Sequence, residues 1–248
     1  MALPAEEWTN PFDGLSLKDI YAGLLTGRFG PRWPSEALQK SFVGTNGVDL
    51  TRRTFQFIDI LDKDGAFKPG WKGFDYGCGF GRFGSTFLSK GSAEQFDLYD
   101  AWQKTIDVIS KLGYKNQIKL LPEILAEGSL PDGRYDFGMS FSVFTHLAPR
   151  SFHSNIPVLL KALKPDGAMY ITVRHDEFFD HKYAARKPEL MKTLEKDGIC
   201  FIDSGGDQTG AKLFGDTVVK EDHLRQFGKV WYVGMPHTLQ HVYAMSPK

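Results

Sequence analysis

The residues from Asp75 to Arg82, Asp-Tyr-Gly-Cys-Gly-Phe-Gly-Arg, combine one acidic side chain with three closely spaced glycines. Glycines let the backbone turn tightly and approach a ligand, and a helix that begins there presents free N–H groups to it. A loop of this kind between a strand and a helix is typical of a nucleotide site. The glycines at 79, 81 and 84 also match the dinucleotide fingerprint G-x-G-x-x-G, so the loop alone leaves two classes of cofactor open.

Three features separate these two classes. Asp75 lies inside the expected strand, two positions before Gly77, where a carboxylate suits an amino-bearing, cationic cofactor and repels a pyrophosphate. Asp100 ends the next expected strand and can accept hydrogen bonds from ribose hydroxyls, which fits either class. The expected C-terminal antiparallel hairpin is unlike the second parallel half of a dinucleotide fold. Together they favour a nucleotide cofactor that carries an amino group.

The elements that position this loop follow from hydrophobic periodicity. From about Phe74 onward, short apolar runs alternate with helix-period segments, a pattern that predicts a parallel sheet covered by helices. We expect strands at 74–76, 96–100, 118–121, 135–141 and 168–173, and an antiparallel hairpin formed by 230–233 and 241–245. We expect helices at 50–61 with Asp49 as N-cap, 82–90, 102–112, 152–163 and 222–227, and a turn at 165–167.

Asp75, Gly77, Gly79 and Gly81 fill the pattern D/E-x-G-x-G-x-G, and in this the chain resembles the class I S-adenosylmethionine methyltransferases. The segments 135–147 and 159–167 also resemble that family's fourth strand and its passage from helix to fifth strand. The likeness covers Phe74 to Val173. It implies an α/β, Rossmann-like fold, in which a seven-stranded, mostly parallel sheet has an antiparallel last strand. It also implies an enzyme that uses S-adenosyl-L-methionine.

The resemblance further implies a cofactor site, residue by residue. The methionine part would be held by Asp75, Gly77, Cys78, Gly79 and Gly81. The ribose would be held by Asp100, and the adenine would contact Ala101, Trp102 and Glu123. Ser140 and Phe141, at the end of the fourth strand, would lie beside the sulfonium. The sequence departs from the commoner pattern at Pro122-Glu123-Ile124, where a Gly-Asp pair is frequent.

The methyl acceptor is constrained mainly by what the fourth strand lacks. Ser140-Phe141-Ser142-Val143 stands where enzymes that methylate exocyclic amines of nucleobases resemble one another in an Asn/Asp-Pro-Pro-aromatic motif. Neither cysteine follows a proline, so the nucleophile of cytosine-ring methyltransferases is missing, and so are the metal-binding carboxylates of catechol enzymes. We therefore expect a small organic acceptor of the sugar or natural-product class, methylated at oxygen, with nitrogen and carbon as the alternatives.

An oxygen acceptor must lose a proton, so a general base is needed. His146 follows the fourth strand and His175 follows the fifth, and both are candidate catalytic residues at the edge where ligands bind in open α/β sheets. His175 and Glu177 also have the H-x-E spacing of some iron oxygenases. That match is short and occurs in the wrong fold, so we expect no metal site.

The chain divides into an N-terminal helical cap or lid, residues 1–70, and an S-adenosylmethionine-binding domain, residues 71–248. The domain includes a substrate-binding insertion near 175–219, which Phe178, Tyr183 and Arg186 could line. In the cap, Arg32, Arg52 or Arg53 could meet the cofactor carboxylate.

The amino-acid composition limits the classes of binding partner that we expect. Thirty basic and thirty acidic residues cancel, which argues against a nucleic-acid partner. No apolar run is long enough for a membrane span, and the N-terminus lacks a signal-peptide pattern. Two cysteines, Cys78 and Cys200, form no disulfide framework, so we expect a cytoplasmic protein of undetermined oligomeric state. The alternatives are an NAD(P)-dependent oxidoreductase and a cofactor-binding module without turnover.

Overall fold

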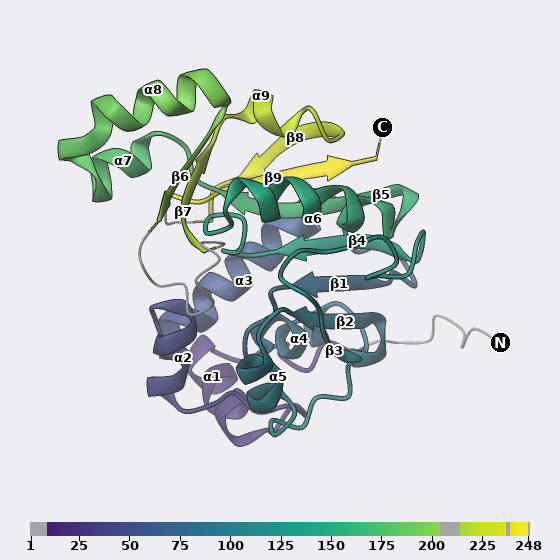
Figure 1. Cartoon of the computed structure of the whole chain (residues 1–248). Helices are drawn as coiled ribbons and strands as arrows, with labels where there is room; N and C mark the ends of the chain where they lie inside the picture. The colour runs from purple at the N-terminus through teal and green to yellow at the C-terminus, as the bar shows by residue number, and fades with distance from the viewer. Residues whose placement is uncertain (1–8, 204–213, 237–238, 248) are drawn as a thin grey trace. The chain divides into compact units, whose positions relative to one another are not determined.

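The computed structural model describes residues 9–203, 214–236 and 239–247. Seven strands form one sheet in the order β3-β2-β1-β4-β5-β9-β8, and a separate two-stranded sheet contains β6 and β7 (Figure 1). The pairs β1–β2, β2–β3 and β4–β5 are parallel, whereas β9 is antiparallel to both β5 and β8. The predicted fold class, a mostly parallel seven-stranded sheet with an antiparallel last strand, is confirmed.

The chain forms two compact units, residues 1–121 and 122–248. The strands of the first unit are β1 (Gly73–Tyr76), β2 (Phe96–Asp100) and β3 (Ile118–Leu120). Its α-helices are α1 (Leu17–Thr26), α2 (Glu36–Val43), α3 (Gly47–Lys63), α4 (Arg82–Thr86) and α5 (Gln103–Ile109), with short 3-10 helices at Phe87–Ser89 and Ala93–Gln95. Every residue of β1 and β2 is buried, as expected for strands inside a parallel sheet.

The N-terminal helices pack against the glycine loop within this first unit. Trp33 and Leu50 share one buried hydrophobic cluster with Phe80, the residue between the last two glycines of the motif. Trp33 Nε1 also donates a hydrogen bond to Ser85 Oγ on α4 at 2.7 Å. Because a buried indole N–H that finds its partner fixes the ring orientation, this contact fastens the helical segment to the loop.

The second unit contains the remaining strands and helices. Its strands are β4 (Tyr135–Ser140), β5 (Leu163–Val173), β6 (Ile199–Asp203), β7 (Gly215–Val219), β8 (Lys229–Gly234) and β9 (His241–Ser246). Its helices are α6 (Pro149–Lys161), α7 (Glu177–Lys182), α8 (Lys187–Asp197) and α9 (Glu221–Leu224), with a 3-10 helix at Ala184–Arg186.

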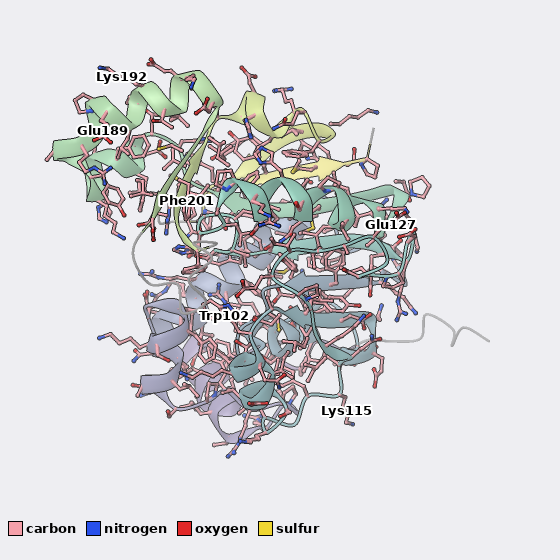
Figure 2. All side chains as sticks on the ribbon, viewed as in Figure 1. Trp102, Lys115, Glu127, Glu189, Lys192 and Phe201 are labelled. Carbon is pink, nitrogen blue, oxygen red and sulfur yellow. The ribbon has the colours of Figure 1, made fainter. Side chains whose placement is uncertain are left out.

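The insertion after β5 has a small core of its own. Figure 1 shows α7 and α8 beside the antiparallel pair β6–β7, and Phe178, Leu190, Leu194 and Ile202 are buried together between them. Phe178 therefore stabilises the insertion and does not line a surface, contrary to the sequence-based expectation. Glu189 and Lys192, labelled on α8 in Figure 2, lie on the exposed outer face of this helix.

Three helices of the first unit differ from their predicted bounds. The helix α5, expected at 102–112, ends three residues early at Ile109. The N-cap of α3 is Asn46, so Asp49 lies in the first turn, where it pairs with Arg52 and Arg53. The helix α4 was expected to reach residue 90 but ends at Thr86 and continues as a 3-10 turn. Ser85 Oγ and Thr86 Oγ1 both donate to the Arg82 carbonyl, and such local bonds compete with regular helix propagation.

In the second unit, the expected turn at 165–167 lies inside β5. Tyr135 pairs with Leu163 and Phe137 with Ala168, so β5 accommodates the extra residues as an irregularity in its register. A Cβ on Gly167 would lie 2.9 Å from the Asp136 carbonyl oxygen, which shows how closely the two backbones approach there. The helix α9 ends at Leu224, three residues before the predicted end at Phe227.

Candidate functional site

The glycine loop is connected by hydrogen bonds to the neighbouring strand. Gly77, Gly79 and Gly81 have φ values of 81°, 55° and 82°, in the left-handed region that favours glycine. The N–H groups of Gly77 and Cys78 both donate to the Tyr99 carbonyl oxygen, at 2.8 and 3.0 Å. These two N–H groups therefore hold the loop against β2, and the loop offers a ligand close backbone approach. A Cβ on Gly79 would meet only Phe42 Cδ1, at 3.7 Å.

The Asp100 carboxylate is held in a defined orientation at the end of β2. Its Oδ2 accepts from the Gly79 N–H at 3.0 Å and its Oδ1 from the Trp102 N–H at 2.9 Å. Asp100 is 7% exposed, and burial raises its pKa while the hydrogen bonds from Trp102 and Gly79 lower it. Hydrogen bonds from the Thr105 side chain and the Ala101 N–H lower its pKa as well.

The two predicted adenine contacts next to Asp100 are partly open. Trp102 is 48% exposed and is labelled in Figure 2, directly after β2. Ala101 is half-buried between Asp100 and this indole. An exposed indole face beside a hydroxyl-binding carboxylate suits a nucleoside, because planar rings stack on aromatic side chains.

Asp75 is the most unusual group of the first unit. It is 1% exposed, and neither carboxylate oxygen has a hydrogen-bond partner among the described residues. Burial raises its pKa to about 8, and the guanidinium of Arg82 opposes that rise. Since a buried carboxylate without a partner is costly, this geometry is suited to a cationic donor from a ligand.

These observations test whether S-adenosylmethionine fits the residues present. The cofactor carries an ammonium group and two ribose hydroxyls, and the first unit offers one carboxylate for each of these needs. Asp75 would receive the ammonium and Asp100 the hydroxyls, while the glycine loop leaves room between them. The chemistry of the donor set therefore fits the cofactor.

Three other predicted cofactor residues lie in the second unit. Ser140 is the last residue of β4 and is fully buried, and Phe141 follows it half-buried. The Glu123 carbonyl accepts a hydrogen bond from Asn155 Nδ2 at 3.0 Å, which fixes its backbone, and its side chain is half-buried. Their contacts with the cofactor remain predictions.

His146 follows β4 in a strongly constrained setting. Its Nδ1 lies 2.7 Å from the Gly215 carbonyl oxygen, and its ring stacks on Phe214 with centroids 4.8 Å apart. Its Nε2 lies 3.4 Å from a guanidinium nitrogen of Arg174. Burial, followed by the charge of Arg174, lowers the pKa of His146 to about 4, so the ring is neutral at physiological pH.

His175 follows β5 and is linked to two further side chains. Its Nδ1 lies 2.7 Å from the Val219 carbonyl oxygen and its Nε2 lies 2.9 Å from the Tyr243 hydroxyl. The same hydroxyl lies 3.1 Å from Glu221 Oε2. Burial lowers the pKa of His175, with the Val219 hydrogen bond opposing it.

Several polar residues near these histidines have no signal in the sequence. Arg174 Nη1 donates to Asp216 Oδ1 at 2.6 Å, and both residues are buried. Ser142, two residues past β4, has φ of 61°, and Gln240 Nε2 donates to its Oγ at 3.1 Å. Such contacts join residues far apart in the chain, so no spacing rule predicts them. The positive φ of a serine likewise depends on tertiary packing.

Other features of the described ranges bear on alternative functions. No group of three His, Cys, Asp or Glu side chains there could hold a metal ion. No helix among the same residues is both long and apolar enough to cross a membrane. A cavity of about 500 Å³ in the first unit is lined by residues that include Trp33, Leu38 and Lys104. Arg32, one of the three arginines predicted to meet the cofactor carboxylate, also lines it, whereas the glycine loop and Asp100 do not.

Comparison with known proteins finds a methyltransferase domain within the chain. Residues 74–171 match the family model of a methyltransferase domain. No curated protein matches the chain in sequence.

The fold is also similar to solved structures. The PH0226 protein of Pyrococcus horikoshii OT3 has a TM-score of 0.60 and 14% identity, over 87% of this chain and 100% of that one. An S-adenosylmethionine-dependent methyltransferase of Methanosarcina mazei has a TM-score of 0.53 and 16% identity, over 75% and 97% of the two chains. At these identities the likeness concerns the fold. The domain match therefore shows a methyltransferase domain at residues 74–171, and the sheet has the antiparallel last strand of the class I methyltransferase fold.

Proposed function

We propose that the chain transfers the methyl group of S-adenosylmethionine to a hydroxyl oxygen of a small organic molecule, a sugar or natural-product intermediate. The cofactor supplies the electrophilic methyl group, so the chain's own residues have to bind and orient the acceptor, exclude water and accept its proton. The observation that carries the proposal is a set of neutral polar groups: Ser142 and His146 after β4, His175 after β5, and Gln240 before β9.

Ser142 and Gln240 are suited to hold a hydroxylated acceptor. Ser142 lies just past β4 and Gln240 just before β9, whose residue His241 pairs with Val173 at the end of β5. The Ser142 N–H donates to Thr172 Oγ1 at 2.6 Å, which holds the serine in its left-handed conformation. Gln240 Oε1 is buried and lacks a hydrogen-bond partner in the described part of the chain. An unsatisfied amide oxygen supports a ligand that brings a hydroxyl or N–H donor.

Of the two predicted bases, His175 is better suited to take the acceptor proton. The Tyr243 hydroxyl has one proton and lies within reach of both His175 Nε2 and Glu221 Oε2. Because His175 Nδ1 faces a carbonyl oxygen and carries the ring proton, Nε2 is the basic nitrogen. The acceptor proton would reach Nε2 through the Tyr243 hydroxyl, which gives its own proton to Nε2 and takes up one from the acceptor. The pKa of His146, about 4, makes that ring a weak base, since general bases work best near the operating pH.

The test is a product assay with wild-type enzyme, S-adenosylmethionine and a panel of sugars and phenols, in which S-adenosylhomocysteine release and product mass are measured. We expect a mass gain of one methyl group on a hydroxylated member. His175→Gln is expected to lower kcat by ~10²–10⁴-fold, the range for loss of a general base, whereas His146→Gln lowers it less.

The pH profile distinguishes the base from a structural histidine. Since burial lowers the pKa of His175, the acid limb of kcat/KM should fall below the ordinary histidine value of about 6.5, and His175→Gln should remove it. Methyl transfer only to protein or nucleic acid would overturn the proposed acceptor class. Tight cofactor binding without any transfer would indicate a binding module, and tight NADH binding that S-adenosylhomocysteine does not displace would favour an oxidoreductase.

A further inference from the structure

Arg53 on α3 faces the segment where the glycine loop passes into α4. Leu50, three residues earlier, belongs to the buried cluster that contains Phe80. Phe57, four residues later, has its ring 5.3 Å from that of Phe83. Residues spaced by three and four share one face of a helix, so Arg53 lies on the face that packs between Phe80 and Phe83.

The surroundings of Arg53 leave its guanidinium incompletely bonded. Its Nε lies 2.8 Å from Asp49 Oδ2 but outside hydrogen-bond geometry, and that nitrogen is buried with no hydrogen-bond partner among the described residues. Asp49 Oδ1 is meanwhile bonded to Arg52 Nη1 at 2.9 Å. The Arg53 side chain is 33% exposed, against 50% for Arg52. Arg53 is therefore the more enclosed of two neighbouring arginines that share one carboxylate.

The charges around this position are arranged to suit a zwitterion. Burial lowers the pKa of Arg82 to about 10, the Asp75 carboxylate opposes that change, and the positive charge of Arg53 adds to it. Arg82 is thus electrostatically close to both groups. Two guanidinium groups and one buried carboxylate without a hydrogen-bond partner among the described residues lie around the same loop. A ligand that brings both an ammonium and a carboxylate would complement them.

We propose that Arg53 binds the carboxylate of the cofactor's methionine part, while Asp75 receives its ammonium. This inference rests on the proposed methyltransferase function, and it assigns a residue before the matched methyltransferase domain to the cofactor site. A guanidinium can bind a carboxylate through two parallel N–H···O bonds, which fixes the orientation of the amino-acid group as well as its charge.

The test compares two ligands by titration calorimetry. S-adenosylhomocysteine carries the amino-acid group, whereas methylthioadenosine has the same nucleoside and thioether without it. For Arg53→Gln we expect at least about tenfold weaker binding of S-adenosylhomocysteine, the effect of losing a charge-assisted hydrogen bond, and binding of methylthioadenosine within about twofold of wild type. Arg53→Lys should lose less, because it keeps the charge without the planar fork.

Arg52→Gln is the matched control, since Arg52 contacts the same Asp49 and is more exposed. It should bind both ligands like the wild type. An Arg53→Gln protein that binds both ligands normally, or that loses both equally, would overturn the proposal. Failure of the wild type to bind S-adenosylhomocysteine would instead contradict the proposed function. Thermal unfolding of each variant shows whether it keeps its fold. The Arg53→Lys protein, which retains the positive charge, serves as a second variant if Arg53→Gln does not fold.

Discussion

At the scale of single residues, the site depends on carboxylates with different surroundings. Asp100 is oriented by two backbone N–H groups, whereas Asp75 is buried and accepts no hydrogen bond from the described residues. Because bonded carboxylates stay ionised more readily than isolated buried ones, the two groups should respond differently to a ligand. We expect Asp100 to keep its place and Asp75 to change its protonation state.

That difference predicts proton release on cofactor binding. The pKa of Asp75 is about 8, so the carboxyl of the free protein is mostly protonated at pH 7. An ammonium group favours the ionised form, and binding should therefore release up to about one proton. The measurement is calorimetry with S-adenosylhomocysteine in phosphate and in Tris, whose ionisation enthalpies differ. Asp75→Asn should lose the dependence on buffer, and an unchanged dependence would contradict this role of Asp75.

His146 predicts a loss of stability in mild acid. Its pKa is about 6.5 when unfolded and about 4 when folded, so between these values only the unfolded chain binds the proton. The free energy of unfolding should fall as the pH decreases from 6.5 towards 4, by up to about 3 kcal/mol. Chemical denaturation at several pH values checks this. The variant His146→Gln should show a flatter dependence of the free energy of unfolding on pH. The variant His181→Gln, at an exposed position, should keep the wild-type dependence. Equal profiles for the wild type and both variants would contradict this role of His146.

At the scale of elements, the proposed cofactor site lies where the chain passes from β1 through the glycine loop into α4. Gly81 has φ of 82°, and a Cβ there would lie 2.6 Å from Ile109 Cδ1 and 2.7 Å from Tyr114 Cζ. The Tyr114 hydroxyl also donates to the Gly81 carbonyl at 2.8 Å. The loop therefore tolerates no side chain at this glycine, for conformational and for steric reasons.

Gly65 provides a matched control for that claim, because it has the same φ of 82° and a Cβ added there would meet nothing within 4 Å. Gly65→Ala should cost about 1–2 kcal/mol of folding free energy from the left-handed backbone alone. Gly81→Ala should cost about 1–3 kcal/mol more because of overpacking, and should also weaken S-adenosylhomocysteine binding. Denaturant titration measures both costs. Equal costs at the two positions would show that crowding around Gly81 is unimportant.

The sequence predicts elements well where local patterns agree with tertiary packing. The second strand was expected at 96–100 and is found there, because Phe96, Leu98 and Tyr99 supply a short apolar run that is buried in the sheet. The residues expected to form a turn at 165–167 lie instead inside β5, as an irregularity in its register between the paired residues Leu163 and Ala168. Asp49 was expected as an N-cap, but its carboxylate instead pairs with Arg52 and Arg53.

Some residues of the candidate site could likewise be predicted from local sequence patterns, and others could not. The motif predicts Asp75 and Asp100 because their positions relative to the glycines are fixed by the strand, loop and helix. Gln240, Tyr243 and Asp216 could not be predicted, since each meets its partner only through folding of segments that are 22 to 98 residues apart. Side chains that meet only through non-local contacts show no periodic pattern or fixed spacing in the sequence.

At the scale of the whole molecule, charge limits the class of partner. Thirty basic and thirty acidic residues give a net charge of zero, so counterion release from a nucleic-acid backbone would contribute little. We expect binding to a labelled DNA or RNA duplex at about 0.15 M salt to be weaker than ordinary non-specific binding, with Kd above ~10⁻⁴ M. Fluorescence anisotropy tests this, and tight binding with a steep salt dependence would argue for a nucleic-acid acceptor.

The most direct test of the cofactor assignment is calorimetric binding of S-adenosylhomocysteine to the wild type and to Asp100→Asn. The wild type should bind, and the variant should bind at least about tenfold more weakly, because a charge-assisted hydrogen bond to the ribose contributes ~1.5–3 kcal/mol. Unfolding curves of both proteins show whether the variant keeps its fold. Weakened binding by a folded variant would support the cofactor and its orientation on the glycine loop. No binding to the wild type would contradict the assignment of this loop to S-adenosylmethionine.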